Sequence, residues 1–310
     1  MPLLVTPVLL KRRFKAMGGP CELNLWLDPG EPVANQALFG QLQSELGRLE
    51  AKYSRFQSHS LLSQINRGEW NNRALDAETC GLLNYIDHCF DLSCKLFDPT
   101  VGILRRVWDY SRSELPDPVA LGRLMPSIGW PKLAWTGHHL RLLPGMELDF
   151  GGVVKEFAVD RLVVILKQQG VSGLVNLAGD IGTSALQPGD RPWQVAMRHP
   201  RHTQTALATL DLAIGGLAGS GDYERFITVA GRRYSHLLRP DTGFPPVDGL
   251  AAITVLADSC LMAGSVATIA MLAGPTLAEQ TVQAWLDEIN IPYLAVDQTL
   301  NVFGSIKVNG

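Results

Sequence analysis

"MELDFGGVVKEFAVDRLVVILKQQG", residues 146–170, is the stretch of this chain in which the succession of elements is clearest. Its first part predicts a β-strand that ends at Phe150, and a Gly-Gly corner at 151–152 follows. Apolar residues at helical spacing then run to Gly170, a residue type that commonly ends helices. The stretch therefore predicts a strand, a tight corner and a helix in direct succession.

The segments after this helix predict further strands. "LVNLAGDIG" (174–182) predicts a strand that ends in a second turn of small residues. Between 193 and 257, short apolar segments alternate with turn residues, which is typical of an antiparallel sheet. A helix over 259–273, preceded by Asp258 and Ser259 as N-cap candidates, completes an α+β pattern.

The N-terminal half predicts two more helices. Leucines recur at intervals of three and four residues from 38 to 49, so we expect a core-facing helix over 35–53. A second helix is expected over 76–95, with Asp76 as its N-cap. Between these helices the chain is polar and serine-rich, which favours a loop that is held against the protein.

The segment 110–147 is rich in proline and glycine, with short alternating pieces, and favours short strands and loops over helices. The sequence contains no internal repeat, low-complexity tract or clear interdomain linker.

Composition limits the classes of partner. The 310 residues carry a formal net charge of −3, so electrostatics gives no reason to expect nucleic acid or an anionic membrane as partner. No segment has about 18 uninterrupted apolar residues, so we expect no membrane span. The first apolar run precedes the charges at 11–13, which inverts the order of a secretory signal.

The five cysteines favour a reducing compartment. Their number is odd, no CxxC spacing occurs, and most lie within apolar patterns, so we expect buried, reduced thiols. Cys21 follows the charged residues and lacks the spacing of a lipoprotein signal. We therefore expect a cytoplasmic protein.

Gly264 lies in the middle of the apolar helix predicted over 259–273. Glycine in a helix interior costs about 1 kcal/mol relative to alanine, so its presence requires a reason. Either another segment approaches the helix closely at this point, or the glycine replaces a side chain that related proteins carry.

Three glycine-containing corners, at 149–155, 176–180 and 216–223, are candidate anion sites. Backbone N–H groups at such a corner and at a helix N-terminus attract an anion, and Lys155 would add a full positive charge. His236 precedes a Pro-Asp-Thr-Gly turn, which would hold its imidazole beside a rigid loop. The sequence has no HxxxH zinc spacing, no GxSxG elbow and no Walker loop.

Seven blocks, in this order along the chain, resemble the ApbE family of FAD:protein FMN transferases. They are "SRFQSHSLLSQIN" (54–66), "FDPTVG" (97–102), "LDFGGVVKEFAVD" (148–160), "VNLAGDI" (175–181), "GSGDYERF" (219–226), "YSHLLRPDTGFP" (234–245) and "AITVLADSCLMAGSVATIAMLAG" (252–274). The resemblance implies an α+β, T-fold-like domain over residues 1–310, with antiparallel sheets flanked by helices. That domain is either one unit or two lobes around a central flavin-nucleotide cleft.

The resemblance also implies an activity. Members of the family bind FAD, cleave its pyrophosphate with Mg²⁺, release AMP, and esterify FMN onto a threonine or serine hydroxyl of an acceptor protein. This phosphoryl transfer requires neutralisation of the pyrophosphate charge and removal of a proton from the hydroxyl. Lys155 would serve the first need and His236 the second, so both are candidate catalytic residues.

The implied contacts to the cofactor are drawn from the same blocks, together with Met17 at the N-terminal "MGG" corner, where the family places an aromatic or methionine contact; Tyr53 is a secondary candidate for that contact. The set is Met17, Gly151, Gly152, Lys155, Gly179, Asp180, Ser220, Gly221, Asp222, Tyr223, His236, Thr242 and Gly243.

The resemblance suggests that this chain has lost a metal ligand. The family has an aspartate where this chain has Gly264, four residues before Thr268, and both of those family side chains line the Mg²⁺ site. Residues four apart share a helix face, so the pair would present two oxygens to one cation. A backbone carbonyl from the corner before Lys155 completes the protein ligands in the family. Gly264 is then the relic of the lost ligand, with a close helix crossing as the alternative.

Glu156 stands where the family usually has glycine, and it would either repel the pyrophosphate or replace the missing carboxylate as a metal ligand. Asp180 and Asp258 are other candidate replacements, although Asp258 is more simply a helix N-cap.

Two further departures lie in the other corners. Ala178 replaces a glycine of the family's Gly-Gly-Asp corner, and Gly219 replaces a threonine before Ser220.

Three functions remain open at this point. The chain is an FMN transferase that acts on a cytoplasmic acceptor flavoprotein, or it is a catalytically impaired flavin-binding carrier, sensor or assembly partner. In the third alternative, a changed pocket runs different chemistry on a related nucleotide.

Overall fold

A single eight-stranded antiparallel sheet forms the centre of the computed structural model, which describes residues 6–308 apart from 203 and 278. The first five residues of the N-terminal segment discussed above therefore lie outside the described residues. The strands, in spatial order, are β1 (Val8–Ala16), β2 (Gly19–Leu27), β5 (Gly173–Leu177), β6 (Asp180–Thr183), β9 (Gly215–Gly221), β12 (Leu250–Ala257), β15 (Tyr293–Asp297) and β16 (Val302–Gly304).

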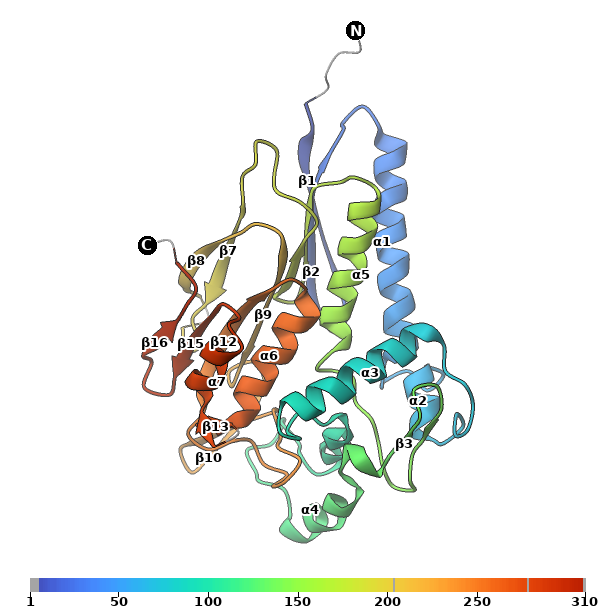
Figure 1. Ribbon diagram of the computed structural model, residues 1–310, viewed down its shortest axis with the longest axis vertical. Helices are drawn as coiled ribbons and strands as arrows, with labels where there is room; N and C mark the ends of the chain where they lie inside the picture. The colour runs from blue at the N-terminus through green and yellow to red at the C-terminus, as the bar shows by residue number, and fades with distance from the viewer. Residues whose placement is uncertain (1–5, 203, 278, 309–310) are drawn as a thin grey trace.

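The sheet is covered on both faces. Three helices, α1 (Pro32–Tyr53), α5 (Val154–Gln168) and α6 (Cys260–Ala273), cover one face, as Figure 1 shows. The hairpin of β7 (Trp193–Arg198) and β8 (Ala206–Leu212) covers the other face. Consecutive residues of β5 face opposite sides, so Val175 packs with the helices and Leu174 packs with the hairpin. The architecture confirms the α+β prediction.

A second group of helices, 3₁₀ turns and two hairpins occupies the lower part of Figure 1. They are α2 (Leu61–Asn66), α3 (Ala77–Leu92), α4 (Pro118–Leu124), 3₁₀ turns at Pro99–Arg106, Met125–Ser127 and Trp130–Lys132, and the hairpins β3 (Ala134–Trp135) with β4 (Leu140–Arg141) and β10 (Phe226–Val229) with β11 (Arg232–Ser235). Next to α6 lie β13 (Thr276–Leu277), β14 (Gln280–Thr281) and α7 (Val282–Glu288).

The predicted long helices are present with small shifts at their ends. Asp76 caps α3 by accepting a hydrogen bond from Thr79 N at 3.1 Å, as expected. The helix ends at Leu92 because Cys94 and Lys95 adopt left-handed backbone conformations, with φ of 51° and 74°.

The cap of α6 corrects part of the prediction. Ser259 is the N-cap, and its side-chain oxygen accepts a hydrogen bond from Met262 N, so Asp258 does not fill that role.

The predicted strand ending at Phe150 does not form. Residues 145–150 are irregular, although Leu148 and Phe150 are fully buried. The side chain of Asn66 forms hydrogen bonds with both backbone groups of Leu148, at 2.8 and 2.9 Å, and so takes the place of a neighbouring strand.

Helical turns also form in two segments where loops were expected. α2 lies within 54–70 and buries Leu62 and Ile65 behind a Ser60 cap. α4 lies within 110–147, where Asp117 accepts hydrogen bonds from the backbone of the first turn after Pro118.

All five cysteines are free thiols in the structure. Four of them are buried, as predicted, and Cys94 is exposed.

Helices α5 and α6 lie side by side in a fixed register (Figure 1). The carboxylate of Asp160 on α5 accepts hydrogen bonds from the first two backbone N–H groups of α6, Cys260 at 2.8 Å and Leu261 at 2.9 Å. One turn away on both helices, Gly264 faces Glu156. A Cβ atom at position 264 would lie 2.5 Å from Glu156 Cγ, so the glycine permits this close approach.

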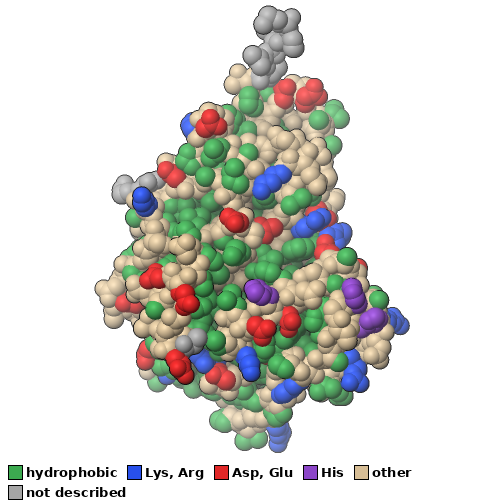
Figure 2. Space-filling model, in the orientation of Figure 1, with side chains coloured by type: hydrophobic (Ala, Val, Ile, Leu, Met, Phe, Trp, Pro, Cys, Tyr) green, Lys and Arg blue, Asp and Glu red, His purple; other side chains and the backbone are tan. Residues whose placement is uncertain are grey.

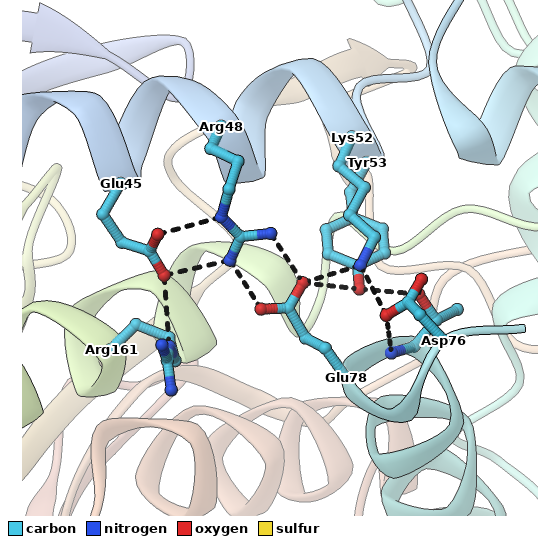
Figure 3. Close-up of polar contacts among 8 residues, drawn as sticks. Glu45, Arg48, Lys52, Tyr53, Asp76, Glu78 and Arg161 are labelled. Atoms are coloured by element: carbon cyan, nitrogen blue, oxygen red, sulfur yellow. Dashed lines mark hydrogen bonds and ion pairs between the residues drawn. The ribbon is translucent and has the colours of Figure 1, made fainter.

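A network of charged residues joins α1, α3 and α5, as Figure 3 shows. Glu78 accepts hydrogen bonds from Arg48 at 2.6 and 3.0 Å and from Lys52 at 2.8 Å. Arg48 also pairs with Glu45, which Arg161 of α5 reaches at 3.2 Å. Burial opposes ionisation of Glu78, but the hydrogen bonds from Arg48 and Lys52 outweigh it and lower the pKa of this carboxyl to about 2.

Substitution of Glu78 tests the network. Glu78→Gln is expected to lower the free energy of unfolding by about 1 kcal/mol near neutral pH, a modest value because solvent screens the site. The folded-state pKa lies below the ordinary value of 4.5, so this stabilisation is present above pH 4.5 and is lost as the pH falls toward 2. Urea unfolding of both proteins near neutrality and at about pH 3 measures it.

Glu69→Gln, which breaks the exposed pair with Arg67, is the control and is expected to change neither value. A Glu78→Gln difference that stays constant with pH would contradict the assigned pKa shift.

Alanine at position 264 tests the contact between α5 and α6. Gly264→Ala gains about 1 kcal/mol of helix propensity, but the clash with Glu156 costs about 1–3 kcal/mol, so we expect destabilisation. In a Glu156→Ala background the clash is absent, and the same substitution is expected to stabilise. Urea unfolding of the four proteins gives the coupling free energy.

The matched control is Gly81→Ala, because Gly81 is an exposed glycine within α3 and a Cβ there meets open space. It should stabilise the protein in both backgrounds. Equal effects of Gly264→Ala with and without Glu156 would refute the close contact.

Candidate active site

The main cavity lies at the end of the sheet where two hairpin turns meet the segment 97–105. It encloses about 1050 Å³. Both turns are two-residue loops with left-handed backbones, Met17-Gly18 between β1 and β2 and Ala178-Gly179 between β5 and β6. A Cβ on Gly19 would lie 2.5 Å from that of Ala178, so glycine at position 19 lets the two turns touch.

The predicted anion corner forms one wall of the cavity. Gly151, Gly152 and Lys155 all line it, at the start of α5. Asp149 organises the corner, because its carboxylate accepts a hydrogen bond from Gly151 N at 2.9 Å and pairs with Arg55. Because Asp149 takes up the Gly151 N–H, the corner presents the Gly152 N–H and the Lys155 ammonium to the cavity, at the beginning of a 15-residue helix.

Lys155 is ion-paired inside the cavity. Its Nζ lies 2.8 Å from Oδ2 of Asp180, the first residue of β6. Burial opposes the charged lysine, but the carboxyls of Asp180 and Glu156 outweigh it and raise its pKa. Lys155 therefore carries a positive charge at neutral pH.

Two acidic side chains are buried next to this lysine. Glu156 is 7% exposed and Asp180 is 2% exposed. Burial raises the pKa of both carboxyl groups, and their mutual proximity raises that of Glu156 further. Among the described residues, no donor forms a hydrogen bond with Glu156 Oε2. Thr268 of α6 also lines this cavity.

His236 lies directly after β11 and lines the cavity. Its side chain is in contact with solvent, but the surrounding cavity wall removes part of the hydration that the charged imidazole would need. This desolvation lowers the pKa of the imidazole, so the neutral form predominates at pH 7. Nδ1 lies 3.2 Å from the carbonyl oxygen of Arg225, which favours the tautomer that donates from Nδ1. In that tautomer Nε2 keeps its lone pair and can accept a proton.

The structure brings most of the predicted site residues to this one cavity. Those that line it are Met17, Gly151, Gly152, Lys155, Glu156, Gly179, Asp180, Ser220, Gly221, Tyr223, His236 and Thr268. The ring of Tyr223 occupies the space that a side chain on Gly221 would need, which explains that glycine.

Three predicted contacts and two secondary candidates lie outside the cavity lining. Asp222 points away and pairs with Arg201 at 2.6 Å, while the carbonyl of Gly243 accepts a hydrogen bond from Trp108. Thr242 is exposed and bonds within its own turn. Tyr53 is buried against Thr79, and Asp258 does not line the cavity.

The sequence analysis missed several residues of the cavity. Five arginines line it, namely Arg13, Arg55, Arg105, Arg198 and Arg225. The stacked rings of Trp108 and Tyr110, 5.7 Å apart, form part of the wall. Arg55 and Arg225 lie within quoted blocks, whereas the other five stand in segments without any motif.

The described residues contain no group of three or more His, Cys, Asp or Glu side chains arranged to hold a metal. Nor does any helix in the described part of the chain have the length and apolar character needed to cross a membrane. On the face drawn in Figure 2, acidic and basic side chains are interspersed.

Solved structures share this fold. An ApbE protein from Thermotoga maritima superimposes with a TM-score of 0.85 at 24% identity, covering 96% of this chain and 97% of that one. A structure titled flavinyl transferase ApbE, from Pseudomonas stutzeri in its apo form, gives a TM-score of 0.84 at 25% identity, covering 97% and 96%.

Curated sequences are also similar. A protein from Chlamydia muridarum named FAD:protein FMN transferase is 31% identical over 242 residues, 74% of each chain. One of the same name from Vibrio cholerae is 29% identical over 273 residues, 83% of this chain and 80% of that one.

The family model described as "ApbE family" matches residues 17–291, a range that includes both hairpin turns, the anion corner and the whole of α6. With most of its length matched and its fold shared, this chain belongs to the ApbE family.

Proposed function

We propose that this chain is an FAD:protein FMN transferase, which moves FMN from FAD to a threonine or serine hydroxyl of an acceptor protein and releases AMP. The observation that carries the proposal is that one cavity holds both an anion-receiving corner with a charged lysine and a neutral imidazole. The names of the similar curated proteins support the same activity.

The cavity suits a dinucleotide. Its volume of about 1050 Å³ is at the upper end of ordinary ligand pockets. Trp108 and Tyr110 line part of its wall, and the Arg225 guanidinium lies over the Tyr110 ring, 5.2 Å from its centroid. Met17, Gly179, Ser220, Gly221 and Tyr223 are proposed as the further contacts to FAD.

The proposed reaction uses two residues directly. The acceptor hydroxyl oxygen attacks the phosphorus of the FMN half, the bond from that phosphorus to the bridging oxygen breaks, and AMP leaves with that oxygen. His236 accepts the hydroxyl proton on Nε2. Lys155 and the backbone N–H group of Gly152 offset the negative charge on the diphosphate, which is the main requirement of phosphoryl transfer.

We propose that Glu156 and Thr268 hold Mg²⁺, beside Asp180. Their fit rests on the buried Glu156 oxygen without a hydrogen-bond partner in the described part of the chain and on the Thr268 hydroxyl, which lines the same cavity one helical turn after Gly264, the residue that Glu156 faces. Mg²⁺ is commonly bound by one or two carboxylates together with substrate phosphates, so a larger acidic cluster is unnecessary. The ion would offset charge on the diphosphate.

We also propose that the protein that receives the FMN is a flavoprotein. The cytoplasmic location, expected from the free thiols, remains a prediction.

A transfer assay tests the proposed function. The purified protein is incubated with FAD, Mg²⁺ and an acceptor domain that carries a target threonine; covalent flavin is read by in-gel fluorescence and AMP by chromatography. We expect a fluorescent acceptor and an equal amount of AMP. His236→Gln should lower the rate by about 10²–10⁴-fold because it removes the proton acceptor, while FAD binding persists.

His88→Gln, in the exposed part of α3 outside the cavity, is the matched control and should keep full activity. Bound FAD without any product from the unaltered protein would contradict the transferase and favour a flavin carrier or sensor.

A further inference from the structure

The carboxylate of Glu156 reaches the cavity through a space that exists only because residue 264 is glycine. A Cβ at position 264 would lie 2.5 Å from Glu156 Cγ and 3.1 Å from both Cδ and Oε1. These distances are too short for any side chain on Gly264 while Glu156 keeps its position. The space between the two helices therefore holds one side chain at this point, either that of residue 156 on α5 or one at position 264 on α6.

The register of the two helices fixes which residues meet. Asp160 binds the first two backbone N–H groups of α6, and Glu156 lies one turn before it on α5. Gly264 lies one turn after Cys260 on α6. The helices run antiparallel through this contact, so the hydrogen bonds to Asp160 place Glu156 opposite Gly264.

The buried carboxyl group of Glu156 is poorly compensated within the protein. It is 7% exposed, and its neighbours are the carboxyl of Asp180, which lies in hydrogen-bonding contact with it, and the single cation Lys155. Within the described residues, its Oε2 atom has no hydrogen-bond partner. Burying an acidic group under these conditions is costly unless a further partner satisfies it. A simple structural role would be served better by an apolar side chain.

The oxygen atoms nearby identify the chemistry of the missing partner. Thr268 follows Gly264 by one turn on α6, so its side chain lies on the same face of the helix as position 264. Both Glu156 and Thr268 line the cavity beside the anion corner. Carboxylate and hydroxyl oxygens next to a diphosphate site suit a hard divalent cation.

We propose that Glu156 on α5 supplies the acidic metal ligand that α6 lacks at position 264. Its carboxylate reaches the metal site through the space that Gly264 leaves open, so the two residues act as a pair. The inference rests on the proposed function, and it adds that neither residue serves the site without the other. Placing the carboxylate on α6 should therefore require removing it from α5.

Binding of Mn²⁺ tests the exchange without any acceptor protein. Free Mn²⁺ is measured by electron paramagnetic resonance during titration of the FAD-loaded protein. Four proteins are compared: the unaltered chain, Glu156→Gln, Gly264→Asp, and the double variant Glu156→Gly/Gly264→Asp. FAD affinity from flavin fluorescence and thermal stability are recorded for each.

We expect Glu156→Gln, which is nearly isosteric, to keep its FAD affinity and stability but to lose about tenfold or more in Mn²⁺ affinity, the scale of effects at metal sites. The double variant should regain the Mn²⁺ affinity of the unaltered chain. Gly264→Asp alone should be less stable, because two side chains compete for one space. Glu69→Gln, which removes an exposed carboxylate outside the cavity, should leave Mn²⁺ binding unchanged.

Undiminished Mn²⁺ binding by Glu156→Gln would overturn the proposal, as would a double variant that folds and binds FAD but does not bind Mn²⁺. The Mn²⁺ titration contains no acceptor, so its result is independent of the transfer assay. A chain that binds Mn²⁺ through Glu156 but transfers no flavin in that assay would refute the proposed function and leave the present proposal standing.

Discussion

The hydrogen bonds from the first turn of α6 to the carboxylate of Asp160 set the geometry on which the rest of the site depends. They fix α6 against α5, the helix that also carries Lys155 and Glu156. Because α5 packs on β5 and β6, the same contact brings Lys155 to Asp180 at the start of β6. One rigid junction of two helices and a sheet therefore positions the anion corner, the lysine and both buried carboxyls.

Much of the fold could be predicted from local pattern. The leucine spacing of α1, the Asp76 cap of α3 and the antiparallel segments after 193 all follow from rules that operate within a few residues. The failures have a different origin. Residues 145–150 are held in an irregular conformation by hydrogen bonds to Asn66, more than 75 positions earlier. The helix α2 forms because Leu62 and Ile65 are buried against residues that are distant in sequence. Such tertiary contacts leave no trace in local sequence.

The candidate site shows the same division. Lys155, Asp180 and His236 stand in recognisable blocks, and the fold brings them to one cavity. Arg13, Trp108 and Tyr110 reach it from segments without motifs, so only the three-dimensional arrangement reveals them. Gly264 is instructive because the sequence raised both a close helix contact and a lost ligand. The two explanations are compatible, since the close contact is made by the side chain that we propose as the replacement ligand.

Anomalous diffraction from crystals grown with FAD and Mn²⁺ tests the central claim, that Glu156 replaces the metal ligand absent from α6, most directly. The account predicts one anomalous peak in the cavity within coordination distance of a Glu156 carboxylate oxygen and the Thr268 hydroxyl, with Gly264 still packed against the Glu156 side chain. A cavity peak that Glu156 does not contact, or a Glu156 carboxylate turned away from the metal, would contradict it.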